Sequence, residues 1–281
     1  MIITNIPNLS IMKASICVFI ITLLITGCSQ TPSFRQTHKP EDYVGSVFRD
    51  AGNLVQSPTH WDSSDVKTFG AIAGGALLIM QTDRSVKNFA LKHRSGTVDY
   101  LADLSVPFGT QRYIVNGAAG TFALSYALGD YRIADTAFLA LEANFFSHSI
   151  MGTMKGFTKR VRPHSTDDPF EFHFFDKHRK DVGSSAFPSG DVTTAFTWAA
   201  VVSESTDSPT IDVVSYGLAS LVAMQRVYYN AHWTSDVFVG AVVGTVVGIK
   251  VVRLNQGKSD NLSLTPIIND DFLGIGATIK F

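Results

Sequence analysis

Hydrophobic residues recur every three to four positions through most of the chain beyond residue 40, and few stretches alternate with period two. Such spacing predicts amphipathic helices, whereas the scarcity of alternation disfavours a sheet core. Polar breaks divide the pattern into expected helices at residues 41–55, 68–81, 86–93, 111–128, 132–160, 191–204, 211–228 and 234–254. The first follows Pro40, a residue suited to an initial helical turn, and is expected to be peripheral. The pattern predicts an all-α fold, a helical bundle of about six core helices within residues 40–256.

Glycines recur at four-residue spacing in two of these segments, as Gly240, Gly244 and Gly248 and as Gly70 and Gly74. Small residues at this spacing share one helix face and let a neighbouring backbone approach closely. We therefore expect close helix packing at both places.

The C-terminal residues 257–281 differ from the helical segments. Residues 261–268 and 273–281 flank a polar Asn-Asp-Asp sequence, and residues 274–279 partly alternate. Short runs of this kind around a polar turn are typical of a β-hairpin. A short hairpin is therefore expected to follow the helical domain and to pack as an ordinary edge.

None of the helical segments has the uncharged length of about 20 apolar residues that a membrane-spanning helix needs. The longest uncharged run, residues 113–129, contains Asn116 and Ser125, and the run 237–249 stops at Lys250. We expect a bundle that is soluble or leans on a membrane, with an integral inner-membrane protein as the alternative.

The N-terminus has the composition of an export signal. Lys13 precedes an apolar run over residues 16–25, and small residues follow before Cys28. A basic flank, a short apolar stretch and small residues at its end describe a signal peptide rather than a spanning helix. The other cysteine, Cys17, lies inside this segment, so the rest of the chain offers neither a disulfide framework nor a cysteine metal site.

The sequence Ile-Thr-Gly-Cys that ends at Cys28 resembles a bacterial lipobox. The resemblance implies a signal peptide over residues 1–27, lipidation of Cys28 and a tether over residues 28–39. Ser29 then resembles the pattern of lipoproteins sent to the outer membrane, so we expect a lipid-anchored, periplasm-facing protein of the cell envelope. The alternatives are a simple signal peptide with an incidental cysteine, or an N-terminal membrane anchor.

Bulk composition limits the partners of the protein. The 281 residues are 45% hydrophobic and 17% charged, with a net charge of −1. A nucleic-acid-binding protein would be expected to carry a clustered basic excess, so no nucleic-acid partner is predicted. The basic residues that do cluster, near residues 155–162, require a local explanation.

Three short strings of residues carry candidate chemistry. In chain order they are Lys155-(six residues)-Arg162-Pro163, Pro188-Ser189-Gly190-Asp191 and Arg226-(five residues)-His232-(three residues)-Asp236. Each string alone has an ordinary structural explanation: a solvated basic face, a turn with a helix N-cap, and a histidine–carboxylate pair at a helix start.

The same strings could also hold and attack a phosphoryl group. Lys155 and Arg162 would share one face of a continuous helix, being nearly two full turns apart. Backbone N–H groups at a helix start, with Gly190 allowing close approach, make an anion site. A carboxylate four residues after His232 can accept a hydrogen bond from one ring nitrogen and leave the other with its lone pair free, as an oriented nucleophile or base requires.

Taken together, the strings resemble the signature of the type 2 phosphatidic acid phosphatase (PAP2) family, which includes class A bacterial acid phosphatases and vanadium haloperoxidases. The resemblance covers residues 132–254. It implies an all-helical bundle and a phosphatase that acts on phosphomonoester or pyrophosphate groups. The substrates implied are lipids of the phosphatidic acid or prenyl pyrophosphate type, or small phosphoesters.

The resemblance also implies a role for each matching residue. The phosphate-binding residues would be Lys155, Arg162, Ser189, Gly190 and Arg226. His232 would attack phosphorus and form a phosphohistidine, which Asp236 would orient and stabilise. This scheme requires no metal and no cofactor.

Two positions depart from the family pattern. Gln225 replaces a serine and can still form hydrogen bonds. Asp191 replaces the histidine that in the family protonates the departing oxygen, and an aspartate can do so only while protonated, with an ordinary pKa of about 3.9. The substitution predicts an acid-shifted optimum, a preference for easy leaving groups, or a weakened enzyme. The rival functions are a vanadate-dependent haloperoxidase and a phosphate- or lipid-binding protein without turnover.

Two further features are left open. Residues 164–187 form a long, phenylalanine-rich connection, either a lid over an apolar substrate tail or a segment packed locally on the bundle. His148 lies seven residues before Lys155 and is expected to be a core histidine or one that supports the site from behind.

Overall fold

The computed structural model describes residues 38–176, 185–206, 208–256, 262–269 and 272–279, the last two ranges by their backbone. The predicted signal peptide, the lipidation site Cys28 and nearly all of the tether lie outside these ranges. The described elements, in chain order, are α2 (Pro40–Gln56), η2 (Ser57–His60), α3 (Ser63–Lys92), α4 (Gly96–Gly109), α5 (Gln111–Ala127), α6 (Tyr131–Thr158), α7 (Gly190–Glu204), α8 (Pro209–Tyr228), α9 (Thr234–Gln256), β1 (Leu262–Asn269) and β2 (Phe272–Ile279).

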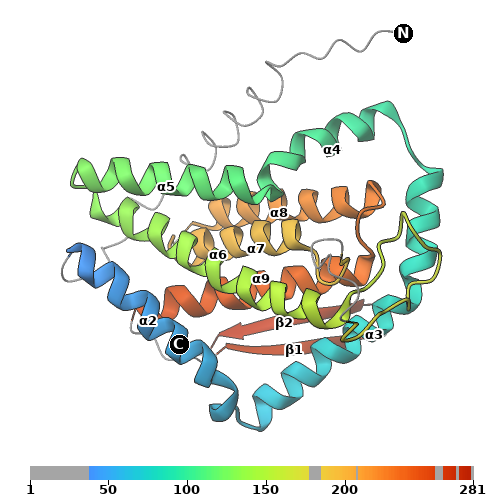
Figure 1. Ribbon diagram of the computed structural model, residues 1–281, viewed down its shortest axis with the longest axis horizontal. Coiled ribbons are helices and arrows are strands. Elements are labelled where there is room, and N and C mark those ends of the chain that lie inside the picture. Colours follow the sequence, from blue (N-terminus) through green and yellow to red (C-terminus); the bar gives the residue numbers. More distant parts are fainter. Residues whose placement is uncertain (1–37, 177–184, 207, 257–261, 270–271, 280–281) are drawn as a thin grey trace.

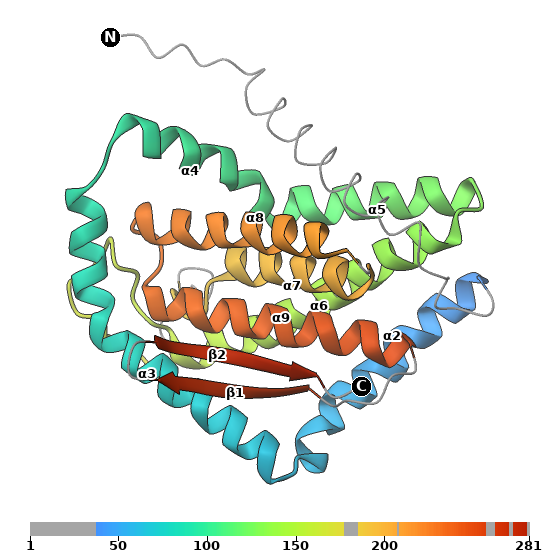
Figure 2. The ribbon, with the colours of Figure 1, turned by 180° about the vertical axis from the view of Figure 1, so that it is seen from behind.

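Helix α7 lies at the centre of a helical bundle, which confirms the predicted all-α fold (Figure 1). Helices α6, α8 and α9 pack around it, α4 and α5 lie beyond them, and α2 and α3 run along the outside, as the view from behind also shows (Figure 2). The main core cluster joins α7, through Trp198 and Val201, to Phe146 of α6 and Val251 of α9. The centre of the bundle is therefore an apolar core of ordinary kind.

The glycines of α9 allow an unusually close approach to α7. A Cβ atom added at Gly244 would lie 2.5 Å from the backbone oxygen of Thr193, and one at Gly240 would lie 2.7 Å from that of Ser189. The predicted close packing is confirmed here. It is wrong for Gly70 and Gly74 of α3, where no described atom lies within 4 Å of an added Cβ.

Helix α3 is one helix of 30 residues, where the sequence pattern predicted two separated by a polar break. The break contains Asp83, and Lys87 follows one turn later; both are buried. These polar side chains point into the protein and find partners there, so the loss of apolar periodicity marks a polar contact and not the end of a helix. Helix α4, which contains Pro107, was not predicted.

Helix α6 ends at Thr158, two residues before the predicted end. Lys159 caps it in the left-handed region with φ of 42°. Arg162 therefore lies outside the helix, and the expectation that Lys155 and Arg162 share a face of one continuous helix is wrong. The turn at Lys159 brings the two side chains to one site by a different route, described below.

Strands β1 and β2 pair antiparallel, with Leu262 opposite Ile279 and Asn269 opposite Phe272, as the sequence predicted. The hairpin lies beside α3 (Figure 1). Among the described helices, α9 is long and apolar enough to cross a membrane, by length and composition alone, so the expectation that no helical segment has this length is wrong for α9. Half of its most apolar stretch is buried in the bundle.

Candidate active site

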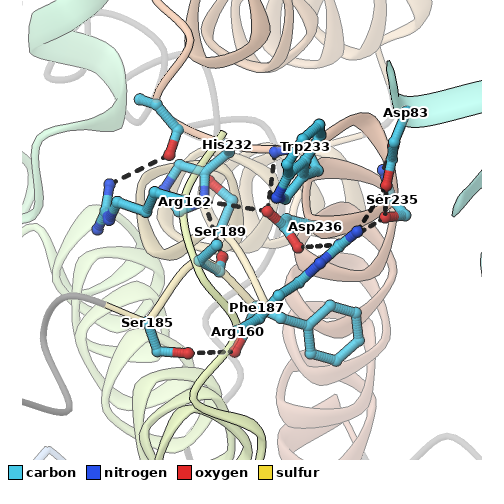
Figure 3. A network of polar contacts seen from close by, with 12 residues as sticks. Asp83, Arg160, Arg162, Ser185, Phe187, Ser189, His232, Trp233, Ser235 and Asp236 are labelled. Carbon is cyan, nitrogen blue, oxygen red and sulfur yellow. Dashed lines mark hydrogen bonds and ion pairs between the residues drawn. The ribbon is translucent and has the colours of Figure 1, made fainter. Parts of the chain in front are cut away.

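Five polar contacts bring the three strings of the sequence together at one place. They are Lys155 Nζ to Ser185 O (2.5 Å), Arg162 Nη1 to Ala231 O (3.3 Å), the Ser189 N–H to Asp236 O (3.0 Å), His232 Nδ1 to Ala186 O (2.8 Å) and the Arg226–Asp191 ion pair (3.0 Å). Each contact joins one string to another or to the residues just before it. The string residues therefore line a shared site at the start of α7 and α9, in which Figure 3 shows Arg162, Ser189, His232 and Asp236.

His232 is buried, with 4% of its surface exposed, in the turn before α9. Because a carbonyl oxygen can only accept, Nδ1 carries the proton in its contact with Ala186 O, and Nε2 keeps its lone pair. Burial lowers the pKa of the imidazole to about 4; the carboxylate of Asp236 opposes this shift, and Arg162 and Lys155 add to it. The ring is thus a neutral base or nucleophile at neutral pH.

Asp236 lies behind His232, but its closest partners are other groups. Its Oδ2 atom is 3.7 Å from Nδ1 of His232 and accepts the backbone N–H of Trp233 at 2.8 Å. Its Oδ1 atom forms an ion pair with Arg160 at 2.5 Å. In this structure the carbonyl of Ala186 orients the imidazole by a hydrogen bond, and the carboxylate of Asp236 interacts with the imidazole electrostatically.

The phosphate-binding candidates present donors toward this site. Burial lowers the pKa of the Lys155 ammonium to about 8, and the neighbouring Arg162 adds to this shift. The Ser189 hydroxyl and the Nε atom of Arg226 are buried, and neither has a hydrogen-bond partner among the described residues. Gly190 begins α7, so its N–H is one of the unpaired donors of a helix start. Buried donors of this kind are expected to need an acceptor, and an anion supplies one.

Asp191 lies in the first turn of α7, and its Oδ2 atom is 3.0 Å from Nη1 of Arg226. The residue that replaces the family's histidine is therefore engaged with one of the phosphate-binding cations. An incoming phosphate would compete with this carboxylate for Arg226.

Sequence reasoning missed two charged residues of the site, Arg160 and Asp83. Arg160 bridges Asp236 and Asp83, and Asp83 in turn binds Ser235 (Figure 3). Arg160 stands inside the six-residue spacer of the first string, where the sequence shows only another basic residue and gives no sign that it is buried. Asp83 carries no local signal beyond the break in periodicity noted above.

His148 supports the site region from α6. Its Nδ1 atom contacts Asn144 O at 3.1 Å and its Nε2 atom contacts the Thr194 hydroxyl at 3.3 Å. Burial lowers its pKa. Within the described part of the chain, no group of three or more His, Cys, Asp or Glu side chains is arranged to hold a metal ion.

The phenylalanine-rich connection packs partly on the site. The Phe172 ring stacks on Phe174 and lies over the Arg160 guanidinium at 5.0 Å, whereas Phe170 and Phe175 remain exposed. The described part of this connection therefore includes local packing, one of the two interpretations that the sequence left open.

Comparisons with known proteins agree with this geometry. The PAP2 superfamily model matches residues 136–260, which contain all three strings. The lipid A 1-phosphatase of Porphyromonas gingivalis is 38% identical over 77 residues, which are 26% of this chain and 17% of that protein. The chain thus spans less than a fifth of that relative's length.

Two solved structures align with part of this chain. LpxE of Aquifex aeolicus has a TM-score of 0.46 at 20% identity, over 60% of this chain and 93% of that one. The first transmembrane PAP2 type phosphatidylglycerolphosphate phosphatase from Bacillus subtilis has a TM-score of 0.49 at 17% identity, over 68% and 94%. The family match includes the residues that converge in the site, so the resemblance to the PAP2 superfamily is confirmed for residues 136–260 of this chain.

Proposed function

We propose that the protein is a phosphatase that removes phosphate from phosphorylated lipids through a phosphohistidine. The observation that carries the proposal is the convergence of Lys155, Arg162 and Arg226 with His232, whose Nδ1 atom donates to a carbonyl and whose Nε2 atom is left unprotonated. Preorganised cations and backbone donors around a phosphoryl group stabilise the charge of the transition state, usually the greatest single contribution to such catalysis.

The proposed reaction has two steps. Nε2 of His232 attacks phosphorus, the bond from phosphorus to the ester oxygen breaks, and that oxygen takes a proton from the carboxyl of Asp191 or from water. A water molecule then attacks phosphorus and gives a proton to the carboxylate of Asp191 or to solvent, and the bond from phosphorus to Nε2 breaks, which releases inorganic phosphate and restores the neutral imidazole. Asp236, at 3.7 Å, stabilises the positive charge that the ring carries between the steps.

An apolar groove beside the site supports a lipid substrate. The groove has a volume of about 410 Å³ and lies between α3, α6 and α9. Its lining includes Met154, which precedes Lys155, and Val239, one turn after Asp236, and it continues along α9 to Val246 and Lys250. We propose that the phosphoryl group binds in the site while the apolar chain follows this groove.

A membrane location is part of the proposal. Large apolar side chains are exposed on several helices, among them Phe69 and Leu78 of α3, Leu101 of α4 and Val213 of α8. Exposed apolar side chains in this number support contact with a membrane. The lipid anchor at Cys28 and the periplasm-facing position at the outer membrane remain predictions about residues outside those described.

The test of this function is phosphate release by the purified full chain in detergent. We expect phosphatidic acid in mixed micelles to have a kcat/KM at least about tenfold above that of water-soluble p-nitrophenyl phosphate, because each buried methylene group contributes about 0.8 kcal/mol. Val246→Trp, which fills the groove, should lower the value for the lipid and leave that for the soluble ester unchanged. No phosphate release from either substrate would overturn the proposed function. Equal effects of Val246→Trp on both substrates would show that the groove does not bind the apolar chain of the lipid.

Asp191 makes a second prediction within the same function. Asp191→His should raise kcat by about tenfold or more for substrates with a poor leaving group, because general-acid catalysis contributes about 10²–10⁴-fold. It should have little effect on p-nitrophenyl phosphate, whose leaving group needs no proton. Asp191→Asn is the matched control, because it removes the charge facing Arg226 without supplying a proton donor. Equal gains in both variants would show that the ion pair, and not the missing histidine, limits the rate.

A further inference from the structure

A buried chain of charges leads from the site through Arg160, in the spacer of the first string, to Asp83 of helix α3. We propose that Arg160 and Asp83 are positioning residues of the active site: together they hold the Asp236 carboxylate behind His232. This inference rests on the proposed function for its kinetic test, and a second test does not depend on turnover.

Arg160 is the centre of the chain of charges. Its Nη1 atom lies 2.5 Å from Asp236 Oδ1 and 2.7 Å from the Ser235 hydroxyl, and its Nη2 atom lies 2.7 Å from Asp83 Oδ2. The Nε atom of Arg160 donates to the carbonyl oxygen of Pro169 at 3.0 Å, and Nη2 donates to the same oxygen at 2.5 Å. A planar guanidinium is suited to such a bridge because its donors point in fixed directions, which a lysine ammonium cannot reproduce.

Asp83 closes the arrangement from α3. Besides Arg160, it accepts the Ser235 N–H at 2.9 Å and the Ser235 hydroxyl at 2.5 Å. Burial raises the pKa of Asp83, and its hydrogen bonds from Ser235 and Arg160 oppose that shift. Ser235 and Asp236 are neighbours in the first turn of α9. Arg160 binds both of them and Asp83 binds Ser235, so the two residues together fix the position of this turn.

The arrangement is shielded from water. Asp83 and Arg160 are each 1% exposed and Asp236 is 0% exposed. The rings of Phe172 and Trp233 lie over the Arg160 guanidinium, at 5.0 and 5.5 Å. Charges in such surroundings interact strongly, and removing one partner leaves an uncompensated buried charge. A change at position 83 or 160 should therefore alter the position of the Asp236 carboxylate. It should also alter the electrostatic environment of the His232 ring, which lies 3.7 Å from that carboxylate.

The kinetic test uses two conservative variants, Asp83→Asn and Arg160→Lys. We expect kcat for phosphatidic acid to fall by about ten- to a hundredfold, the range typical for a lost partner that orients a site side chain, with KM changed less than about twofold. The matched control is Arg253→Lys. Arg253 is also a buried arginine paired with a carboxylate, Glu204 at 3.2 Å, but lies 17 residues beyond Asp236 on α9, about 25 Å away at 1.5 Å per residue.

A variant that is merely less stable behaves differently. Arg253→Lys is expected to lower the melting temperature without changing kcat per folded molecule, and rates for all three variants are therefore measured well below their melting temperatures. If Asp83→Asn and Arg160→Lys keep the wild-type kcat under these conditions, or raise KM at constant kcat, the positioning role is wrong.

The second test reads the His232 imidazole directly, by NMR titration of the protein labelled at histidine. Asp236, Lys155 and Arg162 already act on this ring. Arg160→Gln removes a positive charge from the buried chain and should raise the pKa of His232, whereas Asp83→Asn removes a negative charge and should lower it. The double variant restores the wild-type net charge and should lie between them.

The two tests separate the two proposals. A wild-type protein without phosphate release, but with opposite shifts of the His232 titration, would overturn the function and support the positioning role. Normal phosphate release with an unchanged titration and unchanged kcat in every variant would support the function and overturn the positioning role.

Discussion

Replacement of His232 by alanine is expected to lower phosphate release by at least about a thousandfold, because removal of the nucleophile leaves only binding and electrostatic stabilisation. The cations that hold the phosphoryl oxygens remain in place, so KM should change little. The measurement is kcat and KM for phosphatidic acid with wild type and variant, at equal folded fraction.

His148→Ala is the matched control for this variant. Both histidines are at least half-buried and both direct Nδ1 to a backbone carbonyl, Ala186 O for His232 and Asn144 O for His148. We expect His148→Ala to reduce kcat by less than about tenfold, as a supporting side chain would. Retention of more than a tenth of the activity by His232→Ala would contradict the proposed mechanism.

The largest expected effect on stability comes from Gly244→Ala. The added Cβ would lie 2.5 Å from Thr193 O and 2.8 Å from Thr197 N, both backbone atoms of α7 that cannot rotate away. Helices α7 and α9 must then move apart, at a cost of about 3 kcal/mol, the upper range for overpacking. For a domain of this size the melting temperature should fall by roughly 6–12 °C.

Gly74→Ala provides the control, since it makes the same chemical change in α3. No described atom lies within 4 Å of its added Cβ. Because alanine is favoured over glycine within a helix by about 0.5–1 kcal/mol, this variant should melt at the same temperature as wild type or slightly higher. Equal losses of stability in the two variants would show that contact between α7 and α9 is not what requires a glycine at position 244.

The sequence predicted the helical class and the arrangement of residues within each string for a physical reason. That the three strings would meet at one site was implied by the resemblance to a family and not by local geometry. Each string couples residues by short spacing, so local geometry places Asp236 behind His232 and the Gly190 N–H at the start of α7. The apolar periodicity of the core helices is equally local. The core helices and the geometry within each string could therefore be predicted from residues that are close together in the sequence.

The parts that could not be predicted depend on contacts between distant residues. The break at Asp83 looked like the end of a helix because its partners, Arg160 and Ser235, lie 77 and 152 residues away. The left-handed turn at Lys159 ends helix α6 two residues before the end that the sequence pattern predicted. Nothing in the sequence near Gly74 distinguishes it from Gly244, since only the neighbouring helix decides whether a glycine is needed.

The long reach of α3 has a consequence for folding. Lys87, one turn beyond Asp83, donates to the carbonyl oxygens of Pro163 and Thr166 at 2.5 and 2.8 Å. Because Asp83 accepts the N–H of Ser235, helix α3 contacts both the end of the first string and the start of α9. Contacts so far apart in the chain close large loops and form late. A fragment limited to residues 136–260 would keep every residue of the three strings and still lack these contacts, so we expect the smallest active unit to begin no later than α3.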